Sequence, residues 1–143
     1  MEAKTFKKII QNCVLKYGFI YKNKNYYIND KLIVVINCQK SKYDNSYYIN
    51  YGFWIKEIHE ELSYPLVESC DIVGRFNCII DKTLKFDFCL DALDEECLDN
   101  NLTRNIEDFI IPVLKYGITR YFEMYPKALY SAKKLLKDYM KLE

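Results

Sequence analysis

The chain has 143 residues, of which 50% are hydrophobic and 29% charged, and its formal net charge is +1 at pH 7. This length predicts one domain, over residues 1–143, with a hydrophobic core of its own. Near-zero net charge argues against nucleic acid as a partner. No apolar run approaches the roughly 20 residues that span a bilayer, and the first ten residues lack the apolar stretch of a secretion signal, so the predicted location is the cytoplasm without membrane contact.

Charge is nevertheless distributed unevenly along the chain. Residues 1–56 carry a net charge of +7, residues 57–108 carry −10 and residues 109–143 carry +4. Two interpretations follow: an acidic surface that faces a partner, or oppositely charged segments that lie beside each other in the fold.

The six cysteines are widely spaced and form no CxxC pair. Four of them fall on predicted apolar faces, where a reduced cysteine packs as a small hydrophobic residue: Cys13, Cys38, Cys70 and Cys78. We therefore expect free thiols in a reducing compartment. With a single histidine and no paired cysteines, the sequence predicts neither a metal site nor a cofactor.

Hydrophobic periodicity predicts a helix over residues 6–17, which ends at Gly18. Two short strands around the turn Lys-Asn-Lys-Asn follow, and then two longer strands over residues 31–40 and 47–56. Side-chain alternation sets the register of the longer pair, with Leu32 opposite Ile55 and all apolar partners on one face. The other face then pairs Asn37 with Asn50.

The second half of the chain begins with a second predicted hairpin, over residues 70–80 and 84–90. Its even-numbered residues, Leu84 and Phe86 among them, are expected to point inward, and Asn77 to lie on the polar face. Residues 58–69 are predicted to form a bend or short helix.

Helices follow, with Thr103 and Thr119 as predicted N-caps and a last helix that starts at Pro126. Pro112 is expected to kink the helix or to mark a break near Ile111. The predicted fold class is α+β: an antiparallel meander of about five or six strands, with an N-terminal helix and two to three C-terminal helices packed on its apolar face.

The chain resembles the bacterial family catalogued as domain of unknown function 4304. The resemblance rests on a Gly-Phe after the first helix, an Asn-x-Gln-Lys-Ser strand end, an Asn-x-Gly in the next strand and an arginine in a later one. These motifs correspond to Gly18 and Phe19; Asn37, Gln39, Lys40 and Ser41; Asn50 and Gly52; and Arg75. The family has no established activity, so the resemblance implies a fold unit and no chemistry.

The polar face of the predicted sheet is the main candidate site. Its candidate ligand-binding residues are Asn37, Gln39, Tyr48, Asn50, Gly52, Trp54 and Arg75. Amides and arginine suit a carboxylate or phosphate, Gly52 leaves room for close approach, and an exposed Trp54 is typical of an interface. In the alternative structural interpretation, the two asparagines pair with each other, Arg75 bridges to Asp71 or Asp87, and Gly52 marks a bulge.

Three other features are weaker candidates. Lys40 and Lys42 beside tyrosines suggest either base stacking or a solvated hairpin tip. His59 lacks the surroundings of a catalytic histidine and is expected on the surface. A cluster of acidic residues is a candidate surface for a basic partner or a cation, or the solvated end of a helix, and it lacks the EF-hand pattern: Asp94, Glu95, Glu96 and Asp99.

No catalytic residue is predicted, and whether the protein is an enzyme stays open. The first hypothesis is a non-enzymatic protein-interaction module, similar in a general way to bacterial immunity proteins, which present acidic surfaces to a toxin. The alternative is a small-ligand-binding protein or an enzyme that uses the polar sheet face.

Overall fold

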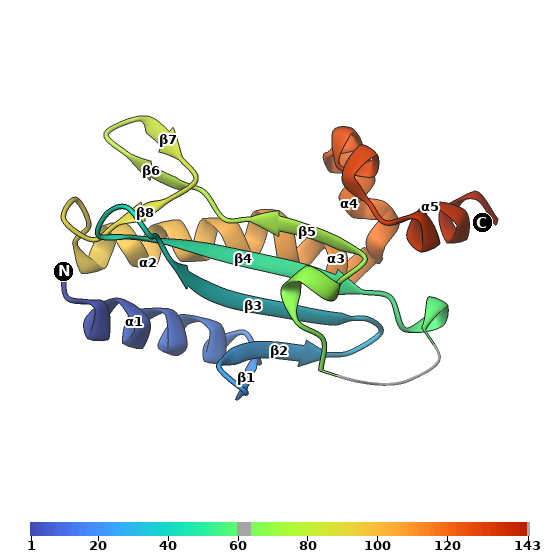
Figure 1. The fold of residues 1–143 in the computed structure, drawn as a ribbon, viewed down its shortest axis with the longest axis horizontal. Helices are drawn as coiled ribbons and strands as arrows, with labels where there is room; N and C mark the ends of the chain where they lie inside the picture. The colour runs from blue at the N-terminus through green and yellow to red at the C-terminus, as the bar shows by residue number, and fades with distance from the viewer. Residues whose placement is uncertain (60–63, 143) are drawn as a thin grey trace.

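An antiparallel sheet of six strands, counted over the described residues, has helices packed on one face (Figure 1). The computed structural model describes residues 1–59 and 64–142. After helix α1 (Ala3–Lys16), the strands follow the order β1-β2-β3-β4-β5, and β8 pairs with the start of β4. They are β1 (Ile20–Lys22), β2 (Asn25–Asn29), β3 (Ile33–Lys40), β4 (Ser46–Trp54), β5 (Ile72–Arg75) and β8 (Phe88–Cys89). The predicted α+β class and meander are confirmed.

Gly18 ends helix α1, as predicted. Its φ angle of +95° lies in a region that side chains disfavour. The N–H of Gly18 donates to the carbonyl of Leu15 at 3.1 Å, and that of Phe19 donates to the carbonyl of Val14 at 3.2 Å. These two bonds form a Schellman motif, which satisfies the last carbonyls of the helix as the chain turns toward β1.

The register of β3 against β4 agrees with the predicted one at every paired residue. Asn37 lies opposite Asn50, and Val34 lies opposite Phe53. Side chains alternate between the two faces of a strand, so this register gathers the amides on one face and apolar residues on the other.

The main core lies between the sheet and two helices, α1 and α2 (Glu95–Asn105). It combines buried residues of β3 and β4 with residues from one side of each helix: Val34, Ile36, Ile49, Tyr51 and Phe53 with Phe6, Ile10, Leu98 and Leu102. The Tyr51 hydroxyl shares a hydrogen bond of 2.7 Å with the Tyr121 hydroxyl, and burial raises the pKa of Tyr51 far above its usual value. This bond ties the C-terminal helices to the sheet.

Two hairpins use the same tight turn. Asn23 and Lys24 between β1 and β2, and Asp81 and Lys82 in the second hairpin, all have φ between 49° and 67°. Consecutive residues with positive φ match a type I′ turn, whose twist fits that of the flanking strands. Both turns lie where the sequence predicts them.

The second hairpin is shorter than predicted and separate from the main sheet. It consists of β6 (Cys78–Ile80) and β7 (Thr83–Lys85), while β5 joins β4 in the main sheet. Leu84 and Phe86 are exposed, at 51% and 57%, so their predicted inward orientation is wrong. The hairpin projects from the body of the protein (Figure 1), and all residues of β7, as well as Phe86 directly after it, are exposed.

Helix α2 binds β6 and the residue before it through two asparagine side chains. Asn105 accepts from the N–H of Asn77 at 2.9 Å and donates to its carbonyl at 2.7 Å. Asn101 does the same to Ile79, at 2.8 and 3.1 Å. Four residues along a helix advance about 6 Å and two along a strand about 6.6 Å, so the two spacings match. Asn77 is therefore buried against α2, which corrects its predicted place on the polar face.

Helix α2 begins eight residues before the predicted cap at Thr103, which is wrong. The Oδ1 atom of Asp94 accepts from the N–H of Cys97 at 2.7 Å and caps the helix. Glu95 and Glu96 occupy the first turn, where negative charge offsets the partial positive charge of the helix N-terminus. The acidic segment is thus the start of a long helix.

A π-helical turn, η3 (Ile106–Ile110), separates α2 from α3 (Ile111–Tyr116). Pro112 has no N–H to donate to a preceding carbonyl, and the wider turn accommodates this loss. The predicted break near Ile111 is confirmed.

The last part of the chain forms α4 (Ile118–Met124), the 3₁₀ turn η4 (Pro126–Ser131) and α5 (Lys134–Leu142). Gly117, with φ of +88°, stands at the N-cap of α4, so the predicted cap at Thr119 is wrong. Pro126 begins the 3₁₀ turn and not the last helix, which starts at Lys134.

The 3₁₀ turn η2 (Val67–Ser69) falls within the predicted bend, and η1 (Lys56–Ile58) overlaps it only at Ile58. Residues 60–63 of the bend lie outside the described residues. In the ranges that the structure covers, no helix has both the length and the apolar character needed to cross a membrane. All six cysteines are free; Cys13, Cys70 and Cys78 are buried and Cys38 is half-buried.

Candidate functional site

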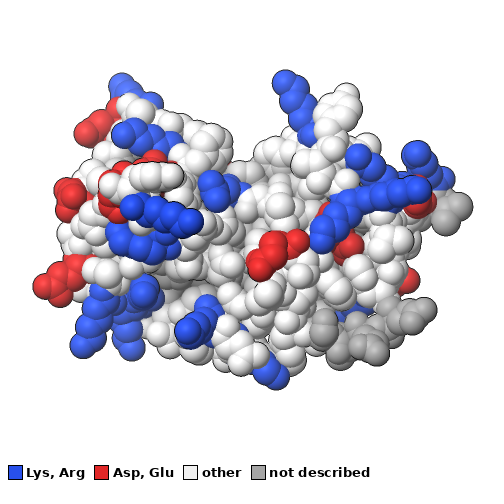
Figure 2. All heavy atoms as spheres, viewed as in Figure 1, with Lys and Arg blue, Asp and Glu red and all other residues white. Residues whose placement is uncertain are grey.

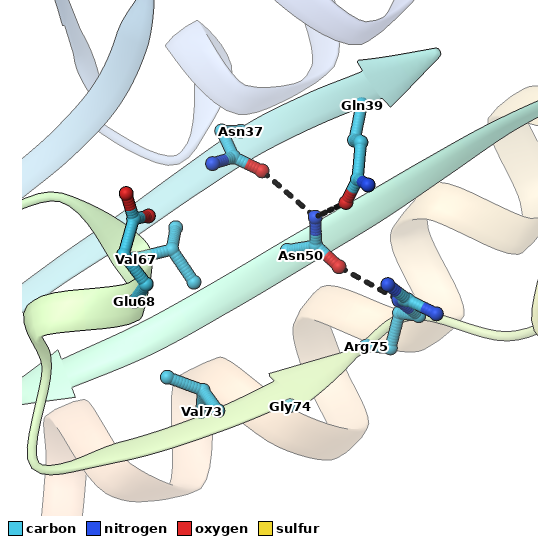
Figure 3. A pocket seen from close by; sticks show the side chains of 8 residues that line it. All are labelled: Asn37, Gln39, Asn50, Val67, Glu68, Val73, Gly74 and Arg75. Carbon is cyan, nitrogen blue, oxygen red and sulfur yellow. Dashed lines mark hydrogen bonds between the residues drawn. The ribbon is translucent and has the colours of Figure 1, made fainter. Parts of the chain in front are cut away.

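Three neighbouring strands bring Asn37, Asn50 and Arg75 side by side. Asn50 on β4 pairs with Asn37 on β3 and with Arg75 on β5. Its Nδ2 atom donates to Oδ1 of Asn37 at 3.0 Å and to Oε1 of Gln39 at 3.1 Å. Its Oδ1 atom accepts from Nε of Arg75 at 2.8 Å (Figure 3). We call these four residues the polar strip.

The arginine sets the direction of every hydrogen bond in the polar strip. An arginine N–H only donates, so the atom of Asn50 that faces it is the carbonyl oxygen. The Asn50 nitrogen then faces Asn37 and Gln39, which must present their oxygens. Their own amide nitrogens, and the two terminal nitrogens of Arg75, have no acceptor among the described residues. The strip therefore offers hydrogen-bond donors to its surroundings.

The ring of Tyr48 also contacts the guanidinium group of Arg75. Its guanidinium carbon lies 4.1 Å from the ring centroid of Tyr48, a cation–π contact that fixes the plane of the guanidinium. The structural interpretation that Arg75 bridges to Asp71 or Asp87 is wrong, since its side chain bonds to Asn50. Tyr48 thus supports Arg75 from the same face of the sheet.

An open groove of about 390 Å³ adjoins the polar strip (Figure 3). It is lined by Asn37, Gln39, Asn50, Val67, Glu68, Val73, Gly74 and Arg75. Residues of η2 form one wall and residues of β5 the other. The side chains of Val67 and Val73 and the carboxylate of Glu68 lie at the end away from Arg75. The groove thus has Arg75 at one end and Val67, Val73 and Glu68 at the other.

Charge on this face is mixed (Figure 2). Basic and acidic side chains are interspersed over the left-hand ends of the central strands, and a further acidic group lies near the centre, over η2. Among the described residues no cation pairs with the Glu68 carboxylate, although Nζ of Lys133 donates to the Glu68 backbone carbonyl at 3.2 Å. Arg75 and Glu68 are the two charged residues that line the groove.

Gly52 serves the packing of η2 and does not line the groove. A Cβ atom at this position would lie 2.6 Å from Sγ of Cys70. Cys70 and Val67 belong to a small second core with Tyr27, Ile33 and Val35. The strand pairing runs through Gly52 without a bulge, so the glycine lets η2 approach the sheet and form the groove wall.

Trp54 also lies outside the groove. It is half-buried, and its ring stacks on His59 with centroids 3.7 Å apart. Nε2 of His59 lies 2.8 and 2.9 Å from the two carboxylate oxygens of Asp71, which is 1% exposed. The same carboxylate accepts from the N–H of Ile55 at 2.7 Å. His59 is thus a structural partner of a buried carboxylate and not the surface residue that the sequence predicts.

The acidic cluster and the hairpin tip lie elsewhere. Asp94, Glu95, Glu96 and Asp99 are all exposed at the start of α2, so a basic partner there stays a prediction. No group of three or more potential metal ligands occurs in the part of the chain that the structure covers. Nζ of Lys40 is engaged by the carbonyl of Asp44 at 2.8 Å, while Tyr43 is 94% exposed.

Sequence reasoning missed the second wall of the groove. Val67 and Glu68 come from a segment without periodicity, and Val73 alternates with Gly74 on a four-residue strand. The signal that pointed to them was indirect: Gly52, in the middle of a strand of large residues, requires a close neighbour.

Comparisons with known proteins place this fold unit in a family. Residues 10–116 match the family described as Domain of unknown function (DUF4304). This range contains the whole polar strip and both walls of the groove. Neither the curated proteins nor the solved structures contain a match to the chain.

Proposed function

The chain belongs to the family described as domain of unknown function 4304, and we propose that this protein is a non-enzymatic interaction module that holds a negatively charged group of a partner protein in the groove. One observation carries the proposal: Arg75, Asn37 and Gln39 line the groove and keep hydrogen-bond donors that have no acceptor among the described residues. A carboxylate accepts through both oxygens, and its bonds to arginine and amide N–H groups are among the stronger ones that proteins make.

The lining residues also favour binding over catalysis. Besides the amides and Arg75, the groove offers two valines, a glycine and one carboxylate, that of Glu68. The described lining contains no serine, cysteine, lysine or histidine that would act as a nucleophile or a base. His59 is engaged by Asp71 and does not line the groove.

Quantitative capture from a lysate of the source organism tests the proposal. Wild-type protein, Arg75→Gln and Arg120→Gln are immobilised at equal density. Arg120 lies on α4, outside the groove and 46% exposed, so its variant matches the loss of charge. We expect at least one protein to be retained by wild type and Arg120→Gln and lost from Arg75→Gln. Capture that is equal on all three baits contradicts the proposal.

A small carboxylate ligand is a second candidate, favoured by the volume of the groove. About 390 Å³ lies near the lower end of the range of small-molecule sites, which is about 300–1,000 Å³. A series of short-chain monocarboxylates in a thermal-unfolding assay tests it. This candidate requires stabilisation of the wild-type protein that is absent in Arg75→Gln.

A further inference from the structure

We propose that the groove binds the carboxyl-terminal end of a partner chain, with the terminal carboxylate at Arg75 and an apolar last residue against Val67 and Val73. This inference rests on the proposed function and names the part of the partner that the groove recognises. It follows from the order of chemical groups along the groove, from its size and from its charge.

The donor-rich end fits a single carboxylate. Arg75 presents its terminal nitrogens, and Gln39 presents an amide nitrogen on the same side, neither of which has an acceptor within the described chain. The free amide nitrogen of Asn37 points the other way, toward Val67 and Glu68 (Figure 3). Because Nε of Arg75 is engaged by Asn50 and the guanidinium lies on the Tyr48 ring, its orientation is set before a ligand arrives. A preorganised fork of donors binds a planar carboxylate with little loss of side-chain entropy.

The apolar end fits a side chain next to that carboxylate. Val67 and Val73 line the part of the groove away from Arg75, and Val73, which is 44% exposed, supplies most of its apolar surface because Val67 is only 6% exposed. In a C-terminal residue, the carboxylate and the side chain share one α-carbon, so one residue reaches both ends. An acidic side chain within a longer segment lacks this combination.

The volume of the groove and the charge of its lining also favour the end of a chain with a single carboxylate. A groove of about 390 Å³ holds the end of a chain and not a long segment passing through it. Glu68 lines the groove beside the valines, and like charges repel, so a second negative charge on the ligand is disfavoured. The occupant therefore carries one carboxylate, in contrast to nucleic acid or a polyacidic tail.

Fluorescence anisotropy with labelled pentapeptides tests the inference. The probes are Gly-Ser-Ala-Val-Val as the free acid, the same peptide as the carboxamide, and an amidated peptide in which the central alanine is glutamate. We expect the wild-type protein to bind the free acid at least about tenfold more tightly than either amide. We expect Arg75→Gln to lose this preference and Arg120→Gln, the matched control, to keep it.

A second comparison tests the apolar end. Free-acid peptides that end in Val-Val or in Ser-Ser are compared on wild type and on Val73→Thr, a change of one methyl to hydroxyl on an exposed position. The preference for Val-Val is expected to fall in the variant. Peak shifts of the side-chain amides of Asn37, Gln39 and Asn50 in NMR spectra place the peptide directly.

The outcomes separate this inference from the proposed function. Equal binding of acid and amide, tighter binding of the internal glutamate peptide, or no binding overturns the inference. If a protein partner still depends on Arg75 in the capture experiment, the proposed function stands without it. If neither a partner nor a peptide depends on Arg75, both fail.

Discussion

The Nε atom of Arg75 lies 2.8 Å from Oδ1 of Asn50, and this contact determines which atoms of the polar strip face the groove. Since arginine never accepts a hydrogen bond, the amide of Asn50 has one orientation, and those of Asn37 and Gln39 follow from it. The chemistry of a surface that spans three strands thus depends on the identity of one amide.

Replacement of Asn50 by aspartate is expected to reverse the direction of the hydrogen bonds from residue 50 to Asn37 and Gln39. A carboxylate only accepts, so Asn37 and Gln39 must rotate to donate to it, which turns their oxygens toward the groove. Affinity for a carboxylate ligand should fall at least about tenfold. The free energy of unfolding should change by less than about 1 kcal/mol, because the position is only half-buried.

Peptide titration and urea unfolding measure these two quantities. Asn100→Asp, on the exposed side of α2, provides the same change of charge away from the groove. Full retention of ligand affinity in Asn50→Asp would show that the direction of the amides is unimportant.

Asn105→Ala is expected to lower the free energy of unfolding by roughly 1–3 kcal/mol. The change leaves the buried N–H of Asn77 without an acceptor, which costs about 1–3 kcal/mol, while the Asn77 carbonyl keeps its bond from Arg104 at 3.0 Å. Urea unfolding gives the total, and amide exchange at Asn77 reports the local loss. Asn100→Ala, five residues earlier on the same helix and exposed, should change little.

His59→Ala is expected to lower the free energy of unfolding by about 2 kcal/mol and to shift the fluorescence of Trp54. Among the described residues, the change leaves the backbone N–H of Ile55 as the remaining hydrogen-bond donor to the buried Asp71 carboxylate. It also exposes the ring of Trp54 that His59 covers. Because the chain has one tryptophan, the change in fluorescence reports on Trp54 alone. A variant with unchanged emission and stability would rule out this role of the stack.

Gly52→Ala is expected to cost about 1–3 kcal/mol, since the new methyl group would lie 2.6 Å from Sγ of Cys70. In a Cys70→Gly background, which removes the colliding atoms, the cost of the same change should be smaller. Urea unfolding of the four proteins gives the coupling between the two sites. Additive effects would mean that close packing of Cys70 against Gly52 does not cause the loss of stability.

The protein should lose stability in alkaline solution. Burial, with a smaller contribution from the neighbouring Asp71 carboxylate, raises the pKa of Cys70 from 9.0 to about 12. Below pH 9 the thiol is protonated in both the folded and the unfolded chain, so it contributes no pH dependence. Between pH 9 and 12 only the unfolded chain releases the proton, so the free energy of unfolding falls as pH rises, by up to about 1.4 kcal/mol per pH unit.

Urea unfolding at several values between pH 8 and 11 measures this slope. Cys70→Ala should show a shallower slope than wild type, whatever its stability at pH 8. Equal slopes in the two proteins would assign the alkaline loss to other buried groups, such as Tyr26, whose pKa burial raises to about 12.

Sequence reasoning succeeded where a strand has one buried and one open face. The pairing of Asn37 with Asn50 could be predicted because a slip of one residue would move Val34 and Phe53 out of the core. The same reasoning failed at Leu84 and Phe86, because the β6–β7 hairpin is separate from the main sheet. Both side chains are exposed, so the alternation of apolar residues does not indicate a buried face there.

The groove depends on contacts between distant segments, which one sequence does not reveal. Val67 reaches the sheet because Gly52 admits Cys70, and His59 meets Asp71 across twelve residues that include the bend. The residues of the polar strip could be predicted from side-chain alternation alone. The apolar residues of the groove, Val67 and Val73, could not be predicted in this way.

The asparagine pair of α2 is also expected to protect the protein from self-association. An edge strand with free N–H and carbonyl groups is a template on which strands of other molecules assemble. Asn101 and Asn105 occupy those groups on the outer side of β6, as a neighbouring strand would. Without these bonds the hairpin would combine exposed apolar side chains, Leu84 and Phe86, with an unpaired strand edge, so loss of either amide is expected to promote aggregation as well as to lower stability.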